Sequence, residues 1–309
     1  MDVSDLSLKS ACVRQLCRQF VRGTGARHVS SVVAVLAAVS AAACFGGSSA
    51  LQHLAASREA TVAPLDVGLL ARLLRSPGWI LGQLLSFLGI GAQAVALLLA
   101  PILVVQPLLV LGLPIAVMLR AYLVRARASR TDLLISALCA AAVGALVLAI
   151  TVHENDSHVS NGALVLMTTC IIVVAGVAAA STRIGPTALI CGASAGALLG
   201  FAAVALRAVT TYVAQPIDPT LAVLVVLMVI AALLGLLLAQ TAFQRASIAG
   251  PLAALTLAEP LAAVALARPV LGESASLTPV STVVVVIALA VGIWSVIQLA
   301  KASGAVESE

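Results

Sequence analysis

Long apolar runs separated by short polar stretches fill the chain from residue 29 to residue 300. A helix of about 20 apolar residues is long enough to cross the hydrocarbon core of a membrane. The runs lack the alternation typical of lipid-facing strands, so the pattern favours helices over a barrel. We therefore predict an all-α, polytopic transmembrane helix bundle. Its nine helices are expected at residues 29–55, 78–100, 101–123, 133–152, 162–180, 186–208, 221–241, 247–270 and 279–300.

The composition narrows the class of protein. Hydrophobic residues make up 62% of the 309 positions and charged residues only 9%, a balance that excludes a soluble globular domain. The six cysteines form no C-x-x-C pair, and the chain has no G-x-x-x-x-G-K-[ST] motif. We therefore expect no metal site, no cofactor, no nucleotide-driven pump and no enzymatic activity. The basic residues lie mostly at the ends of apolar runs, which indicates membrane topology and not a nucleic-acid partner.

The basic residues also give an orientation. Four arginines lie at residues 120–130, after the third run, whereas the loop at residues 153–161 has no Lys or Arg. Loops rich in Lys and Arg stay on the cytoplasmic side of a membrane. We therefore expect a multi-pass protein of the plasma membrane, with the C-terminal tail, residues 301–309, in the cytoplasm.

The N-terminal tail, residues 1–28, is basic. Nine crossings place this tail outside, against the rule that orients the other loops. A short or re-entrant crossing at residues 62–74 would bring the tail inside and raise the count to ten. The tail itself fits either an amphipathic helix lying on the membrane or a solvated, disordered segment.

A four-helix unit is predicted to occur twice, as residues 29–152 and residues 186–300. The first helix of the first unit contains FGGSSALQHLA and the first helix of the second contains GASAGALLGFAAVAL, both rich in small residues. The helix at residues 162–180 would link the units and invert the second. Transporters use inverted repeats to open a site near the membrane midplane to each side in turn.

The eighth run carries an acidic residue at its centre, Glu259, followed by Pro260. A central acidic residue costs about 2.5–3.5 kcal/mol on insertion scales and so indicates a functional site, although a protonated group that only bonds a neighbouring helix is the alternative. Thr256 shares the helix face of Glu259, and it could bind substrate or bond a carbonyl of its own helix. We predict that both contact a substrate, with proton coupling through Glu259 as a hypothesis.

Further site residues follow from local context. Gln106 and Gln240 are candidates for substrate binding because each stands beside a proline or an aromatic turn. Four prolines are expected to kink helices or interrupt their amide ladders: Pro107, Pro114, Pro251 and Pro260. Three glycines at every fourth position are expected to form a close-packing seam, within the bundle or between protomers: Gly192, Gly196 and Gly200. The remaining polar groups in or near the runs could converge on a cavity with Glu259, but each one taken singly is interpreted as a contact between helices or loops: Gln52, His53, Gln93 and Gln244.

Two stretches carry a family resemblance: AVALLLAPILVVQPLLVLGLPIAVMLRAYL at residues 94–123 and AQTAFQRASIAGPLAALTLAEPLAAVALARPVLGE at residues 239–273. They resemble the drug/metabolite transporter (DMT) superfamily, within it the actinobacterial EamA-like proteins near the NIPA-type magnesium transporters. The matching positions are Gln106-Pro107, Gln240 with Phe243-Gln244, Glu259-Pro260 and Gly272-Glu273. The first copy departs from the pattern, because Leu113-Pro114 stands where the second copy has Glu259-Pro260.

The resemblance implies a bundle of inverted repeats that moves a small solute by alternating access, and its usual two five-helix repeats favour ten crossings. We therefore hypothesise a secondary transporter for a small metabolite or a cation, with membrane lipid as its surroundings. A single embedded acid argues against tight Mg²⁺ binding. The alternatives are a non-transporting membrane subunit and a lipid-carrier flippase.

Overall fold

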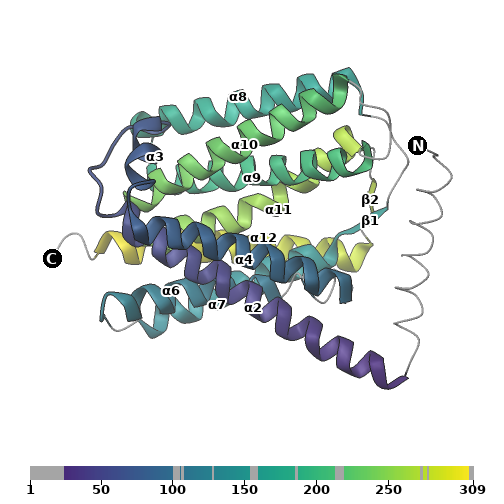
Figure 1. Ribbon diagram of the computed structural model, residues 1–309, viewed down its shortest axis with the longest axis horizontal. Helices are drawn as coiled ribbons and strands as arrows, with labels where there is room; N and C mark the ends of the chain where they lie inside the picture. The colour runs from purple at the N-terminus through teal and green to yellow at the C-terminus, as the bar shows by residue number, and fades with distance from the viewer. Residues whose placement is uncertain are drawn as a thin grey trace, which may run out of the picture.

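The computed structural model is a bundle whose long helices run side by side along the long axis of the molecule (Figure 1). It describes residues 24–99, 105, 108–126, 129–153, 159–184, 187–212, 219–271, 274–276 and 278–305. Within these residues, eight helices are long and apolar enough to cross a membrane. The prediction of an all-helical, multi-pass membrane protein is confirmed, while the exact number of crossings stays a prediction.

The helices follow the apolar runs closely. In chain order they are α2 (Thr24–Ala56), α3 (Val67–Leu73), α4 (Pro77–Leu99), α6 (Gly112–Leu123), α7 (Arg130–Ala149), α8 (Asn161–Ile184), α9 (Thr187–Tyr212), α10 (Pro219–Phe243), α11 (Ala249–Leu271) and α12 (Pro279–Ala305). Two short strands, β1 (Thr151–His153) and β2 (Ser274–Ser276), pair antiparallel. The first helix in the described part of the chain starts at Thr24 rather than at residue 29, and the rest of the basic tail lies outside the described residues.

The third predicted run differs from the expectation of one continuous helix. Helix α6 begins only at Gly112, and the chain before it turns at Val110 and Leu111. Short-range bonds mark this turn, from Leu111 N to Leu108 O and from Leu113 N to Val110 O, both at 3.2 Å. The twelve residues of α6 span about 18 Å, less than the hydrocarbon core. Gln106 and Pro107 lie outside the described residues.

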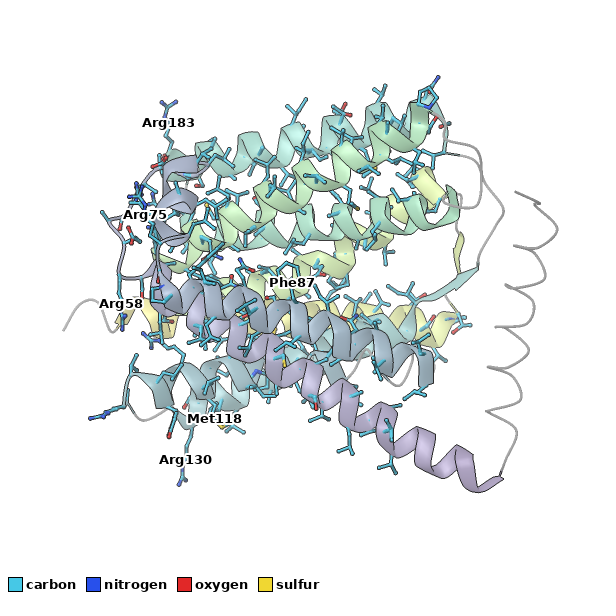
Figure 2. All side chains as sticks on the ribbon, viewed as in Figure 1. Arg58, Arg75, Phe87, Met118, Arg130 and Arg183 are labelled. Carbon is cyan, nitrogen blue, oxygen red and sulfur yellow. The ribbon has the colours of Figure 1, made fainter. Side chains whose placement is uncertain are left out.

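The segment that the ten-crossing alternative needs does not cross the bundle. Helix α3 has seven residues, which is about 10 Å of helix. It lies at the same end of the bundle as Arg58 and Arg75 (Figures 1 and 2). Leu69 and Leu73 on α3 are fully buried, so this helix is packed into the end of the bundle instead of spanning it.

The two ends of the bundle differ in charge. Arg58, Arg75, Arg130 and Arg183 lie at one end (Figure 2), which we call the arginine-rich end. The β1–β2 ladder lies at the opposite end (Figure 1). The helices therefore gather the arginines of separate loops on one side, as the sequence pattern predicts.

Helix α11 is the central element. It contacts α6, α7, α8, α9, α10 and α12. Around it, α9 packs against α10 and α11, while α2 packs against α4 and α6, and α7 packs against α12. Helices α2 and α9 run in opposite directions along the bundle (Figure 1).

The tightest packing is a backbone contact between α9 and α11. A Cβ atom at Gly192, Gly196 or Gly200 would collide with a backbone oxygen of α11, which belongs to Pro251, Leu255 or Glu259 respectively. Without a hydrophobic driving force between helices in lipid, such close approach supplies much of the attraction that holds membrane helices together. The three glycines thus fix α11 against α9.

The prolines fall into two groups. Pro260 lies inside α11, together with Pro269. Pro114 and Pro251 lie in the first turns of α6 and α11, where no amide has a partner within the helix and a proline is tolerated without a kink. This position favours a straight start of each helix, and the expectation that Pro114 and Pro251 kink their helices stays a prediction.

We expect Gly196→Ala to destabilise the protein by about 1–3 kcal/mol, because its methyl group would push α9 away from α11. Gly176→Ala on α8 is the matched control, since a Cβ there meets no atom within 4 Å and removing a helical glycine gains up to about 1 kcal/mol. Thermal unfolding of the purified full chain in detergent measures both. Equal unfolding temperatures would contradict the close approach.

Candidate functional site

Glu259 lies near the middle of α11. The carboxyl group is deep among the helices, yet the side chain is exposed. Because other helices surround α11, we interpret this exposure as an opening inside the bundle. The part of α11 nearer to the arginine-rich end, residues 249–254, is buried. The carboxyl group is therefore shielded toward the arginine-rich end.

Glu259 has few acidic companions. In the eight candidate spans the other acidic residue is Asp132, in the first turn of α7. A carboxylate in the middle of a membrane helix is costly unless water, a partner or a substrate meets it. The position of Glu259 thus fits a group that is reached by solute or solvent.

The neighbours of Glu259 on α11 offer little chemistry of their own. Thr256 Oγ1 donates to the backbone oxygen of Leu252 at 2.8 Å, which is the second of the two roles considered for this hydroxyl. Pro260 has no amide hydrogen, so the carbonyl of Thr256 lacks its usual partner four residues later. A free carbonyl at this depth is tolerated where it lines a cavity or meets protein.

Gln240 takes part in a different set of contacts. Its side chain is fully buried, and Nε2 donates to Gln52 Oε1 at 2.7 Å. Counted along the helices from the α10–α11 turn, Gln240 lies about two helical turns nearer to the arginine-rich end than Glu259. Its amide therefore joins α10 to α2 at that level of the bundle.

The bond from Gln240 ends a buried chain of polar side chains. Gln52 Nε2 donates to Ser48 Oγ at 2.7 Å, and Ser48 Oγ lies 2.6 Å from Ser86 Oγ. The chain links α10, α2 and α4, and Gly82 lets α4 approach Ser48 and Gln52 closely. Buried polar groups that satisfy one another hold helices in register.

Four hydrogen bonds join the end of α2 and the following loop to the α10–α11 turn. They run from Gln240 Nε2 to Gln52 Oε1 at 2.7 Å, between His53 Nε2 and Ala246 O at 3.1 Å, from Gln244 Nε2 to Ala60 O at 3.0 Å, and from Arg245 to Val62 O. We call these contacts, between residues 52–62 and residues 240–246, the polar seam. His53 is a buried member of it, 2% exposed, with its ring edge-on to Phe243.

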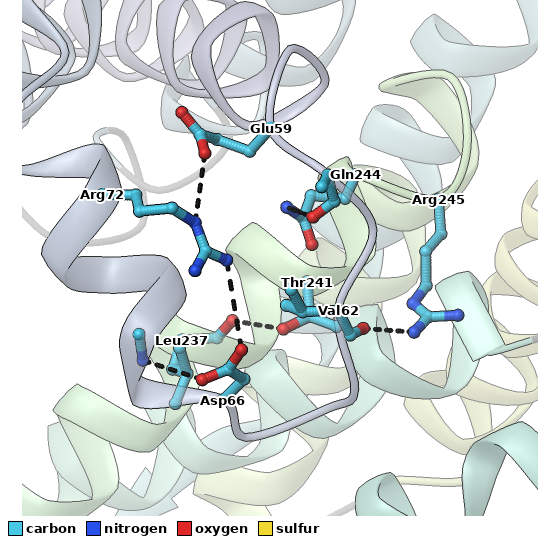
Figure 3. A network of polar contacts seen from close by, with 10 residues as sticks. Glu59, Val62, Asp66, Arg72, Leu237, Thr241, Gln244 and Arg245 are labelled. Carbon is cyan, nitrogen blue, oxygen red and sulfur yellow. Dashed lines mark hydrogen bonds and ion pairs between the residues drawn. The ribbon is translucent and has the colours of Figure 1, made fainter.

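Residues 57–66, which we call the strap, lead from α2 to α3 over the arginine-rich end. Figure 3 shows Arg72 of α3 between Glu59 and Asp66, and Arg245 reaching Val62. Arg72 Nε lies 3.2 Å from Glu59 Oε2 and its Nη2 lies 4.0 Å from Asp66 Oδ2. Asp66 also caps α3 by accepting from Gly68 N at 2.8 Å. These contacts fold the strap onto α3.

The sequence did not point to the strap or to Arg245 as functional parts. The sequence pattern suggests only an additional crossing for residues 62–74. The available signal was the pair of acids, Glu59 and Asp66, in a chain with only 12 acidic residues, set close to Arg72. Among the described residues, no group of three or more His, Cys, Asp and Glu could hold a metal ion.

The chain is similar to a protein of Corynebacterium glutamicum. The two are 30% identical over 284 residues, which is 89% of this chain and 96% of the relative, and that protein is described as uncharacterized. No family model matches the chain. No solved structure matches it either.

We expect a cysteine at position 259 to react with a hydrophilic maleimide at least about tenfold faster than one at position 253, because an enclosed thiol reacts only after local opening. Ala253 is fully buried on the same helix, so Ala253→Cys is the matched control for Glu259→Cys. Both are made after the six natural cysteines are replaced by serine. Equal labelling rates in the reconstituted protein would contradict the exposure of Glu259.

Proposed function

We propose that this protein is a secondary transporter that moves a small metabolite or a cation by alternating access. The chain belongs to the same family as a Corynebacterium glutamicum protein that is described as uncharacterized, so the proposal rests on the residues of the chain itself. The observation that carries this proposal is the exposed side chain of Glu259 at the centre of a surrounded membrane helix. A carboxyl group in this position is consistent with reversible binding of a partner, and a transported solute or a proton is such a partner.

The packing supports an inverted repeat. In the proposed first unit α2 packs against α4 and α6, and in the second α9 packs against α10 and α11. Helices α2 and α9 point in opposite directions (Figure 1), as two copies related by inversion would. With the sequence motifs, this supports placing the chain in the drug/metabolite transporter superfamily, with α8 as the linking helix.

The arginine-rich end is proposed to face the cytoplasm of a plasma-membrane protein. Arginines from four separate segments gather there (Figure 2), and Lys301 lies near the end of the last helix. Positive charge is retained on the cytoplasmic side during insertion. The C-terminus is then cytoplasmic, and Glu259 is reached from the outer side.

Glu259→Gln should lower solute-driven proton movement at least about tenfold, because a neutral amide neither carries a proton nor pairs with a cation. The full chain is reconstituted in vesicles that contain a pH-sensitive dye, with an imposed pH gradient. Sodium, magnesium, methylammonium, ethidium and an amino-acid mixture are added in turn. Collapse of the gradient by one of them is the expected wild-type result.

Asp132→Asn serves as the control, because it removes the other acidic residue in the candidate spans from a helix terminus. Its rate should match that of the wild type. A wild-type rate in Glu259→Gln would refute the role of the carboxyl group. No response of the wild type to any solute would favour the non-transporting subunit or the flippase.

A further inference from the structure

We propose that the strap is the gate of the arginine-rich end: it closes the path in this conformation, and the polar seam releases it when the protein opens to that side. The proposal rests on the proposed transport function. It assigns a task to residues that neither the repeat nor Glu259 explains. These are the strap itself, at residues 57–66, and the turn that holds it, at residues 244–248.

The polar seam joins the two proposed repeats. Every one of its four bonds has one partner in residues 52–62 and the other in residues 240–246. In alternating access the two repeats move against each other. Bonds between them must therefore break and form in each cycle, whereas bonds within a repeat need not.

The hydrogen-bonding groups of the polar seam are only partly satisfied. Partial satisfaction is what we expect of a contact that opens and closes. The four side chains that make the bonds each keep a second buried polar atom without a hydrogen-bond partner among the described residues. These atoms are His53 Nδ1, Gln240 Oε1, Gln244 Oε1 and Arg245 Nε. Water that enters on opening would meet both the broken bonds and these atoms, so part of the cost of separation is returned.

The ring of His53 shows how one bond leaves such an atom. Its Nε2 faces the backbone oxygen of Ala246 at 3.1 Å. A carbonyl only accepts, so Nε2 carries the hydrogen, and Nδ1 of the neutral ring is left as a bare acceptor. Opening exposes this acceptor to water without any change in the ring itself.

Apolar side chains complete the closure. Leu69 and Leu73 of α3 are fully buried, and Trp79, Phe243 and Ile248 beside them are at most 4% exposed. Together they belong to one core cluster at this level of the bundle. The strap and α3 thus close the arginine-rich end with apolar side chains that are packed beside the polar seam.

The backbone of the strap is held in a conformation that its own residues do not favour. Leu65 has a φ of 66°. This is the left-handed region, which a non-glycine residue occupies only where surrounding contacts hold it there. Its side chain packs against two core clusters at once. Undocking the strap would release Leu65 to an ordinary backbone conformation, which favours a second, open arrangement.

The test measures access to α11 from each side of the membrane. Thr256→Cys, on the side of Glu259 nearer to the arginine-rich end, is made after replacement of the six natural cysteines. Membrane vesicles of both orientations are treated with an impermeant maleimide. Arg245→Ala should raise labelling from the arginine-rich side about fivefold, as expected for the loss of one hydrogen bond of ordinary strength, and lower it from the other side.

Arg58→Ala is the matched control, because Arg58 is an exposed arginine at the same end and makes no bond across the seam. It should label as the parent does. Labelling of Arg245→Ala at the rate of Arg58→Ala, in protein that elutes as a normal folded species, would overturn the gate.

A second variant tests closure directly. The double variant Ala60→Cys with Gln244→Cys is joined by a short bifunctional thiol reagent, because Gln244 Nε2 of the parent donates to the backbone oxygen of Ala60 across the seam. Cross-linking of the two introduced cysteines should abolish the solute-driven proton movement that the wild type shows. Transport that survives complete cross-linking would overturn the gate.

The labelling experiment uses no solute, so it separates the two proposals. Faster labelling of Arg245→Ala supports the gate whatever the result of the transport experiment. If no solute collapses the pH gradient, only the proposed transport function is refuted. Solute transport by the wild type together with unchanged labelling of Arg245→Ala refutes the gate alone.

Discussion

The backbone contact between α9 and α11 is the constraint on which the rest of the structure depends. The backbone oxygens of Pro251, Leu255 and Glu259 approach three glycines of α9 so closely that no side chain fits between the two helices. Helices in lipid have no hydrophobic driving force for association, so close backbone contacts supply much of the attraction between them. They hold α11 in the centre of the bundle, and because of this central position we interpret the exposure of Glu259 as an opening inside the protein. Any side chain at these glycines would move the helix that carries the carboxyl group.

Polar groups then divide into two sets with different physical tasks. Glu259 stands at mid-helix with an exposed side chain, whereas Gln52, His53, Gln240 and Gln244 are used between helices and loops. The first arrangement leaves the carboxyl group of Glu259 accessible to a ligand that binds reversibly. The second arrangement uses the side chains for hydrogen bonds within the protein, yet His53, Gln240 and Gln244 each keep one buried atom without a partner among the described residues. This incomplete pairing keeps the contact reversible.

The prolines show how the same residue acts differently by position. Pro260 interrupts the amide ladder of α11 in its interior, next to the acid. Pro114, its counterpart in the first copy, begins a helix instead, because the third run breaks at Val110 and Leu111. The two stretches that the proposed repeat pairs therefore differ in backbone as well as in charge.

The sequence by itself determined the membrane class, nearly all helix positions, the gathering of arginines at one end and the unusual place of Glu259. Each of these follows from local hydrophobicity or from charge along the chain, and both act before the helices pack. Only the tertiary structure decided that Gln240 lies in a seam with Gln52, that residues 62–74 cover an end instead of crossing the membrane, and that Arg245 holds the strap. These contacts join residues more than 180 positions apart, and no local pattern encodes which distant carbonyl or amide a side chain will meet.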